Sequence, residues 1–295
     1  MKKIYLILPI LAGIMFGSSG IFVRTLTQNG IDQTTLLFLR FSIAVIPILI
    51  AILLTDKGLF KIDLSDLPLF LICAICIIGL NLCYNESMTS VSLSLAAVLL
   101  SLAPIYVLII AHFIFNEKIT SKKLICMALA IFGCILMTKV LETDLSNIPL
   151  FGILSGIGAG LFWAIYLMAS KKSIENENHT YTILFYSIIF ISIALVPLTD
   201  FSKIKSFISI NPILVILFLI MHSTFSFALP YILSTLSLNY MDSGISSILL
   251  SGSEPLAALI FGLVIYAEIP TTLMFCGFML SIIAMMLLSR KESVD

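Results

Sequence analysis

Apolar runs of about twenty residues recur along the whole chain, and they restrict it to a membrane-spanning fold. Apolar residues make up 60% of the 295 positions and charged residues only 11%. A soluble domain carries about a quarter of its residues as charged side chains, because its surface must be wetted. The hydrocarbon core of a bilayer is about 30 Å thick, which a helix of about 20 residues spans. We therefore expect an all-α integral membrane protein that is covered by lipid.

The apolar runs predict ten transmembrane helices joined by short polar turns. The expected spans are residues 4–25, 34–54, 67–88, 92–114, 121–139, 149–170, 180–199, 211–237, 243–266 and 271–289. The first run follows two lysines and resembles a signal peptide. It continues to Val23, however, and further spans follow it, so we interpret it as a retained helix.

Basic residues are distributed unequally between the two sets of turns, and this bias predicts the orientation. If the N-terminus is cytoplasmic, the inner turns hold Lys2, Lys3, Lys57, Lys61, Lys118, Lys122, Lys123, Lys171, Lys172, Arg290 and Lys291. The outer turns then hold only Arg24, Lys139, Lys203 and Lys205. We therefore expect a multi-pass protein of the plasma (inner) membrane with both termini in the cytoplasm.

The chain contains an internal repeat. Residues 90–138 align without gaps to residues 241–289, so that Pro104 meets Pro255. Two glycines separated by three residues open each half, at positions 13 and 17 and at positions 156 and 160. The predicted domains are a first five-helix repeat over residues 1–141 and a second over residues 149–290. Five is an odd number, so the second repeat is inverted, an arrangement that places a substrate site near the midplane.

The order of these motifs resembles the drug/metabolite transporter superfamily, specifically its EamA-type ten-helix exporters. The resemblance is carried by GIMFGSSGIFVRTL, LLFLRFSIA, the AP and EP prolines, NEKIT and AEIPTT, and covers residues 10–289. It implies a central cavity surrounded by helices 1–4 and 6–9, with helices 5 and 10 peripheral. Such proteins mostly move amino acids, other metabolites or drugs, often outward. The chain departs from the pattern at Phe16, where many members carry tryptophan.

Glu254 is a carboxyl group about halfway along the ninth expected helix. An ionised carboxylate there costs at least about 2.5 kcal/mol, so it must be protonated, paired or facing a wet cavity. It either couples transport to protons or binds a substrate ammonium group, or it bonds backbone donors beside Pro255. Pro104 and Pro255 each remove a helical hydrogen bond, and each is either a hinge for alternating access or a static kink.

Arg40 lies about two turns into the second expected helix. It either forms an ion pair with Asp32, Glu86 or Glu254, or binds a substrate carboxylate through its planar fork. We predict it as a candidate residue of the substrate cavity.

Further polar side chains within the spans are candidates for the lining of the cavity. Asn81, Tyr84 and Asn85 form a one-sided stripe on the third helix, which either lines a cavity or bonds neighbouring helices. The remaining candidates are Trp163, Tyr166, His222 and Ser223. The two aromatic residues form either a cavity wall or ordinary packing, and the histidine is either a proton relay or a structural residue.

Glu117 and Glu268 occupy matched helix ends in the two halves. A carboxylate at such a position caps the helix that follows and complements its dipole, so we expect both to be structural. Six cysteines lie within apolar runs without a histidine at metal-ligand spacing, so we expect no metal site and no cofactor.

The expected function is secondary transport of a small solute by alternating access, as an exporter of amino acids or related metabolites, with or without proton coupling. The alternatives are a passive facilitator, a uniporter or an uptake carrier. A membrane-embedded enzyme is disfavoured because HExxH, GxSxG and P-loop motifs are missing. The 16 acidic and 16 basic residues cancel, which argues against nucleic acid. The expected partners are a small-molecule substrate and the lipid bilayer, and a homodimer is left open.

Overall fold

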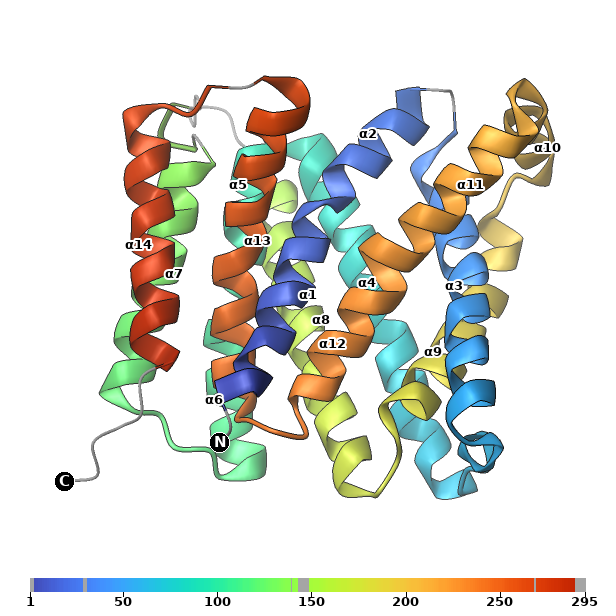
Figure 1. Ribbon diagram of the computed structural model, residues 1–295, viewed down its shortest axis with the longest axis horizontal. Helices are drawn as coiled ribbons and strands as arrows, with labels where there is room; N and C mark the ends of the chain where they lie inside the picture. The colour runs from blue at the N-terminus through green and yellow to red at the C-terminus, as the bar shows by residue number, and fades with distance from the viewer. Residues whose placement is uncertain (1–2, 29–30, 139, 143–148, 268, 290–295) are drawn as a thin grey trace.

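Figure 1 shows the computed structural model, which describes residues 3–28, 31–138, 140–142, 149–267 and 269–289. All regular secondary structure in these ranges is helical, which confirms the predicted all-α class. The helices run between two faces, which we call upper and lower as Figure 1 draws them; α1 begins at the lower face.

In chain order, the α-helices are α1 (Ile7–Gly17), α2 (Ser19–Gln28), α3 (Gln33–Thr55), α4 (Leu67–Ser90), α5 (Leu93–Leu100), α6 (Ala103–Phe115), α7 (Ser121–Met137), α8 (Leu150–Glu175), α9 (Thr180–Leu195), α10 (Phe201–Ile210), α11 (Pro212–Ser223), α12 (Leu229–Ser237), α13 (Ser243–Tyr266) and α14 (Thr272–Ser289). A π-helical turn, Thr224–Ala228, joins α11 to α12.

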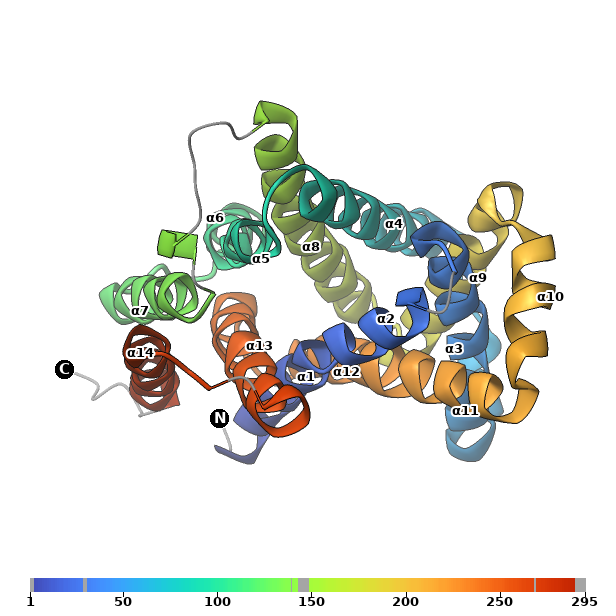
Figure 2. The same ribbon diagram turned by 90° about the horizontal axis from the view of Figure 1, so that it is seen from above.

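In the described part of the chain, nine helical segments are long and apolar enough to cross a membrane. The remaining expected span, the fifth, over residues 121–139, is present as α7, which is shorter at 17 residues. It lies beside α14 at one end of the molecule (Figure 2), which agrees with the peripheral placement of the fifth and tenth helices. Residues 199–206 were expected to form a polar turn, whereas the short helix α10 begins there.

The two matched prolines act differently on their helices. Before Pro104 the helical span is interrupted, and Pro104 becomes the second residue of α6. A proline in the first turn of a helix loses no hydrogen bond, because its missing N–H would have had no helical partner. Pro255 instead lies inside the continuous helix α13. Their roles as hinges remain predictions.

The glycine pairs of the two halves pack against matched segments of the opposite half. A Cβ atom at Gly13 would lie 2.6 Å from the carbonyl oxygen of Leu250 in α13. One at Gly156 would lie 2.8 Å from the Cβ atom of Leu99 in α5. Leu99 and Leu250 are equivalent in the repeat, which pairs Pro104 with Pro255. Glycine is therefore needed in both halves, because it lets the first helix of each half approach a helix of the opposite half closely: α1 approaches α13, and α8 approaches α5.

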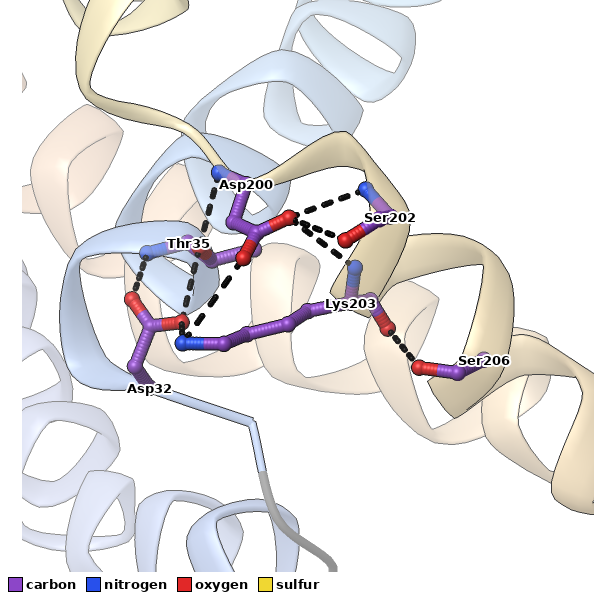
Figure 3. Close-up of polar contacts among 6 residues, drawn as sticks. All are labelled: Asp32, Thr35, Asp200, Ser202, Lys203 and Ser206. Carbon is purple, nitrogen blue, oxygen red and sulfur yellow. Dashed lines mark hydrogen bonds and ion pairs between the residues drawn. The ribbon is translucent and has the colours of Figure 1, made fainter.

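On the upper face, α10 is bound to the start of α3 (Figure 3). Asp32 caps α3 by accepting a hydrogen bond from the Thr35 backbone N–H at 3.0 Å, and Lys203 donates to the same carboxylate at 3.2 Å. Burial by itself would raise the pKa of Asp32, but these hydrogen bonds outweigh it, so the pKa lies below its ordinary value. The backbone N–H of Asp200 donates to the Thr35 hydroxyl at 3.3 Å, which adds a second link between the two halves.

Candidate functional site

A cavity of about 420 Å³ lies between the two halves in the upper part of the bundle. Residues from α1, α2, α4, α5, α6, α7, α8, α12, α13 and α14 line it. Its lining reaches Leu93 at the start of α5, Thr138 after α7 and Met274 near the start of α14, and these helix ends lie at the upper face (Figure 1). The cavity is therefore placed between the membrane interior and the upper face.

Three aromatic rings form one wall of this cavity. Phe16, Trp163 and Tyr231 meet edge to face, with ring centroids 5.3 to 5.7 Å apart. Such pairs are stabilising beyond the area that they bury, so the three rings support one another. Phe16 thus takes an aromatic role although it replaces the tryptophan of many related sequences. Tyr231 was not among the expected residues, since only the histidine and the serine of this span were predicted to line the cavity.

Tyr166 stands behind the wall and does not line the cavity. Its ring is fully buried and contacts Trp163 at 5.3 Å between centroids. Its hydroxyl group lies 2.5 Å from the Thr235 hydroxyl group, a hydrogen bond that joins α8 to α12. Of the two aromatic residues expected on this helix, Trp163 therefore reaches the cavity and Tyr166 supports it.

Glu254 is the one charged side chain among the described residues that line the cavity. It stands on α13 where that helix touches α1, since a Cβ atom at Gly17 would lie 2.5 Å from the Glu254 carbonyl oxygen. Tyr84, from the opposite half, lines the same cavity within electrostatic reach of this carboxyl group. Within the described ranges, no basic side chain forms an ion pair with Glu254, so this carboxyl group has no counter-ion there.

Arg40 is not in an ion pair with any acidic side chain that the structure describes. It donates instead to the Asn81 side-chain oxygen at 2.5 Å, and Asn81 in turn donates to the Ile77 carbonyl at 2.7 Å. The guanidinium carbon lies 5.1 Å from the ring centroid of Phe41 and 5.5 Å from that of Phe227. The first alternative for Arg40, an ion pair with Asp32, Glu86 or Glu254, is therefore wrong for the described structure, in which Asp32 pairs with Lys203 and Glu86 accepts from Ser90.

His222 and Ser223 are fully buried and do not line the cavity. Neither ring nitrogen of His222 and no atom of the Ser223 hydroxyl group has a hydrogen-bond partner in the described structure. The His222 ring stacks on Phe22 at 5.5 Å between centroids. Both residues immediately precede the π-helical turn, a feature that is often found at functional sites.

The remaining candidates are also placed by the structure. Pro255 lines the cavity beside Glu254, whereas Arg40, Pro104 and Asn85 do not line it. Asn81 lies next to Leu80, which is part of the lining, and its side chain bonds Arg40. The residues of the expected stripe on α4 therefore have different surroundings: Tyr84 lines the cavity, whereas Asn81 binds Arg40.

Below the cavity, Glu117 connects three elements from both halves. Its carboxylate accepts hydrogen bonds from the backbone N–H groups of Ser243 at 2.8 Å and Gly244 at 3.3 Å, and from Lys171 at 2.5 Å. The prediction that Glu117 caps the helix following it is therefore wrong: it caps α13, and Thr120 caps α7. Glu268 lies outside the described residues.

The Glu117 carboxylate is ionised and well compensated. Burial by itself would raise its pKa, but the Lys171 ammonium group and the Ser243 N–H outweigh burial and lower the pKa below the ordinary value. The N-terminus of α13 adds the partial positive charge of its helix dipole. A second ion pair, between Lys123 and Asp242 at 2.7 Å, joins α7 to the same end of α13.

Groups of three or more histidine, cysteine, aspartate or glutamate side chains that would hold a metal ion are not found among the described residues. The lining of the cavity itself offers a carboxyl group, hydroxyl groups and aromatic rings. Such a site can bind and release an organic solute or a proton.

Comparison with known proteins gives a family and two relatives. The model of the EamA-like transporter family matches the chain twice, over residues 3–139 and 150–290. A protein of Clostridium kluyveri that is named only as an uncharacterized transporter is 26% identical over 227 residues, which cover 74% of this chain and 72% of the relative. Another of the same name, from Archaeoglobus fulgidus, is 29% identical over 189 residues, or 64% of this chain and 63% of the relative.

The fold also matches a solved crystal structure. The two superpose with a TM-score of 0.80 over 97% of this chain and 96% of that chain, at 11% sequence identity. At this identity, the likeness concerns the fold alone.

Proposed function

Because this chain belongs to the EamA-like transporter family and is a multi-pass membrane protein, we propose that it is a secondary transporter that exports a small metabolite by alternating access. Amino acids are the first candidates for the substrate. We further propose that outward movement of the substrate is coupled to inward movement of protons.

The cavity with its unpaired carboxyl group carries this proposal. A cavity of about 420 Å³ accommodates a solute of the size of an amino acid. It lies at the interface of the two repeats, which is where transporters built from inverted repeats hold their substrates. Glu254 offers the charge that an ammonium group needs, and the Trp163 wall offers a surface for an apolar or aromatic side chain.

The unequal closure of the two faces supports alternating access. The lining of the cavity extends to the upper face, whereas hydrogen bonds of Glu117 and Lys123 join cavity-forming helices at the lower face. With the predicted orientation, the lower face is cytoplasmic and the described state faces outward. Transport then requires that these lower contacts break while the upper ends of the helices come together.

Competition at Glu254 supplies the coupling in this proposal. The carboxylate binds either a substrate ammonium group or a proton. From the outward-facing state, the ammonium group leaves and a proton takes its place. In the inward-facing state the proton leaves and the next substrate binds. Because both ligands need the ionised form of the same group, they exclude one another, which is the requirement for antiport.

Counterflow in proteoliposomes tests the proposal. Vesicles containing the purified protein are preloaded with one unlabelled solute, and uptake of its labelled form is followed for each of the common amino acids. Saturable exchange, together with net movement that is driven by an imposed pH gradient, is the expected result. Exchange without any response to the pH gradient would indicate a facilitator and contradict the proton coupling. A lack of exchange for every amino acid would contradict amino-acid export.

A further inference from the structure

We propose that Arg40 is a second pole of the substrate site, which binds the carboxylate of a zwitterionic substrate whose ammonium group is held by Glu254. This inference rests on the proposed transport function and makes Arg40 the residue that decides whether a substrate must carry a carboxylate.

The charge of Arg40 is unbalanced in the described structure. The residue lies within the span Gln33–Thr55, among apolar neighbours, and the structure describes no acidic partner for it. Charged side chains within membrane spans are costly, and they generally pair with one another or mark a substrate pathway. Asp32 is bonded to Lys203 and the Thr35 N–H, and Glu86 accepts from Ser90 at 2.8 Å. The counter-charge of Arg40 is thus missing from the described chain.

The guanidinium group of Arg40 is held in place and still has donors to offer. Asn81 accepts from one terminal nitrogen, and the ring faces of Phe41 and Phe227 flank the group. This fixes the plane of the guanidinium, yet Nε is buried without a partner. A guanidinium has five N–H donors in a fork that matches the two oxygens of a carboxylate, so donors remain for a ligand. The residue as a whole is only half-buried.

Arg40 and Glu254 share a neighbour. Tyr231 lines the cavity together with Glu254, and its ring centroid lies 4.4 Å from that of Phe227, the ring that flanks Arg40. Arg40 therefore lies directly behind the wall of the cavity that holds Glu254, and neither side chain has a counter-ion in the described structure. A solute with one ammonium group and one carboxylate satisfies both, and the pair then crosses the membrane with little net charge. A simple amine or a simple carboxylic acid leaves one pole unbalanced.

His222 favours an anion at this position as well. Its buried ring lies within electrostatic reach of Arg40, and both of its nitrogens lack hydrogen-bond partners in the described structure. A neutral imidazole has one N–H donor to offer to a carboxylate oxygen. Of the titratable groups, His222 and Tyr231 interact with Arg40, and neither carries a negative charge that would neutralise it.

Binding of three matched probes tests this assignment. The probes are L-phenylalanine, phenethylamine (the same molecule without the carboxylate) and 3-phenylpropanoate (without the ammonium group). Their affinities are measured by equilibrium binding to the protein in lipid nanodiscs, and a leucine series with 3-methylbutylamine and 4-methylpentanoate is run in parallel. Wild-type protein should bind the amino acid at least about tenfold more tightly than the amine, which corresponds to one good charge-assisted hydrogen-bond pair.

The variants Arg40→Gln and Arg40→Lys separate the two poles. Arg40→Gln should weaken binding of the amino acid to the level of the amine and leave binding of the amine unchanged. The affinity of Arg40→Lys for the amino acid should lie between those of wild-type protein and Arg40→Gln, because lysine keeps the charge but not the planar fork of donors. This variant remains informative if Arg40→Gln does not fold. Glu254→Gln should weaken binding of the amino acid and of the amine alike.

Two outcomes overturn the assignment of Arg40. One is a ratio of amino-acid to amine affinity that is the same in Arg40→Gln, Arg40→Lys and wild-type protein. The other is wild-type binding of the amine without binding of the amino acid, in which case transport still stands and only the carboxylate pole fails. If no probe binds and no amino acid exchanges in proteoliposomes, amino-acid export fails together with the assignment.

Discussion

Lys171, in the last turns of α8, donates a hydrogen bond to Glu117 at 2.5 Å. This bond connects the second half of the molecule to the first. The side chains are 15% and 6% exposed, so water screens this pair weakly. The same carboxylate caps α13 through Ser243, which follows it by 126 positions. The Glu117 cluster, formed by Glu117, Lys171 and the Ser243 N–H, is therefore one of the contacts between the halves that would have to break for the lower face to open, beside the Lys123–Asp242 ion pair.

Replacing Lys171 by methionine should destabilise the described state. Removing one partner of a buried ion pair costs about 3–5 kcal/mol, because the other charge is left uncompensated. The matched control is Lys172→Met, since Lys172 and Glu175 form an exposed pair at 3.3 Å whose side chains are 52% and 45% exposed. Loss of an exposed pair costs about 0–1 kcal/mol. Thermal unfolding in detergent measures both variants, and an equal effect of the two would refute a special role for the Glu117 cluster.

The stability of the protein should also depend on pH through Glu117. Its pKa is lowered in the folded protein from an ordinary value of 4.5, so the folded state prefers the ionised form. The resulting stabilisation is complete above the ordinary pKa and is lost as the pH falls through the lowered one. We expect a fall in unfolding temperature on acidification in this window that is smaller in Lys171→Met. An equally large fall in the variant would assign the pH dependence to other groups.

Replacing Glu254 by glutamine should abolish net transport that is driven by a pH gradient while the protein still folds. Glutamine keeps the size of the side chain and imitates the protonated carboxyl group, so it no longer exchanges a proton. Proteoliposome flux with and without the gradient is the measurement. Glu86→Gln is the control, because Glu86 is an exposed carboxylate on α4 that bonds only Ser90 among the described residues. If Glu254→Gln keeps the pH response of the parent, Glu254 does not carry the proton.

Replacing Gly17 by alanine should separate α1 from the part of α13 that holds Glu254. The added Cβ atom would lie 2.5 Å from the Glu254 carbonyl oxygen and 2.9 Å from the Ala257 Cβ atom. Overpacking of this kind costs about 1–3 kcal/mol. Gly20→Ala is the control, because nothing lies within 4 Å of a Cβ atom there. Unfolding temperatures should fall for the first variant and stay equal or rise for the second; a silent Gly17→Ala would contradict the close contact.

The predicted orientation is tested by labelling single cysteines in a background without the six native ones. A cysteine at Lys118, near the Glu117 cluster, should resist a membrane-impermeant maleimide in intact cells. A cysteine at Lys203, in the upper-face cluster of Figure 3, should react. The reverse pattern would place the cavity on the cytoplasmic side in the described state, and equal labelling would contradict the separation of the two faces.

The class of fold followed from the sequence because length and hydropathy are local properties. Each apolar run of about twenty residues has to satisfy its own backbone hydrogen bonds in lipid, and a helix does so without help from the rest of the chain. The repeat was also visible, since Pro104 and Pro255 and the two glycine pairs recur in order. The helix α10 was missed because its ten residues are amphipathic rather than apolar, and its place is fixed by Asp32 and Thr35.

The candidate site could be predicted only in part. Glu254 was a candidate because a charge within a span is costly, and Trp163 because it lies one helical turn from Tyr166, as part of either a cavity wall or ordinary packing; both Glu254 and Trp163 line the cavity. Tyr231 was not, because a tyrosine in an apolar span is ordinary in composition. It is its position opposite Phe16 that makes it part of the wall.

By itself, the sequence determined that the chain is a bundle of membrane-spanning helices built from two related halves, since those features depend on residues that are near one another or in register along the chain. Only the tertiary structure decided which polar groups meet. Glu117 was expected to cap the helix that follows it and instead caps α13. For Arg40 an acidic partner was one of two alternatives, and the structure places it against Asn81 instead. The physical reason is that a partner depends on the rotation and tilt of helices packed from opposite halves, and a local pattern does not contain those angles.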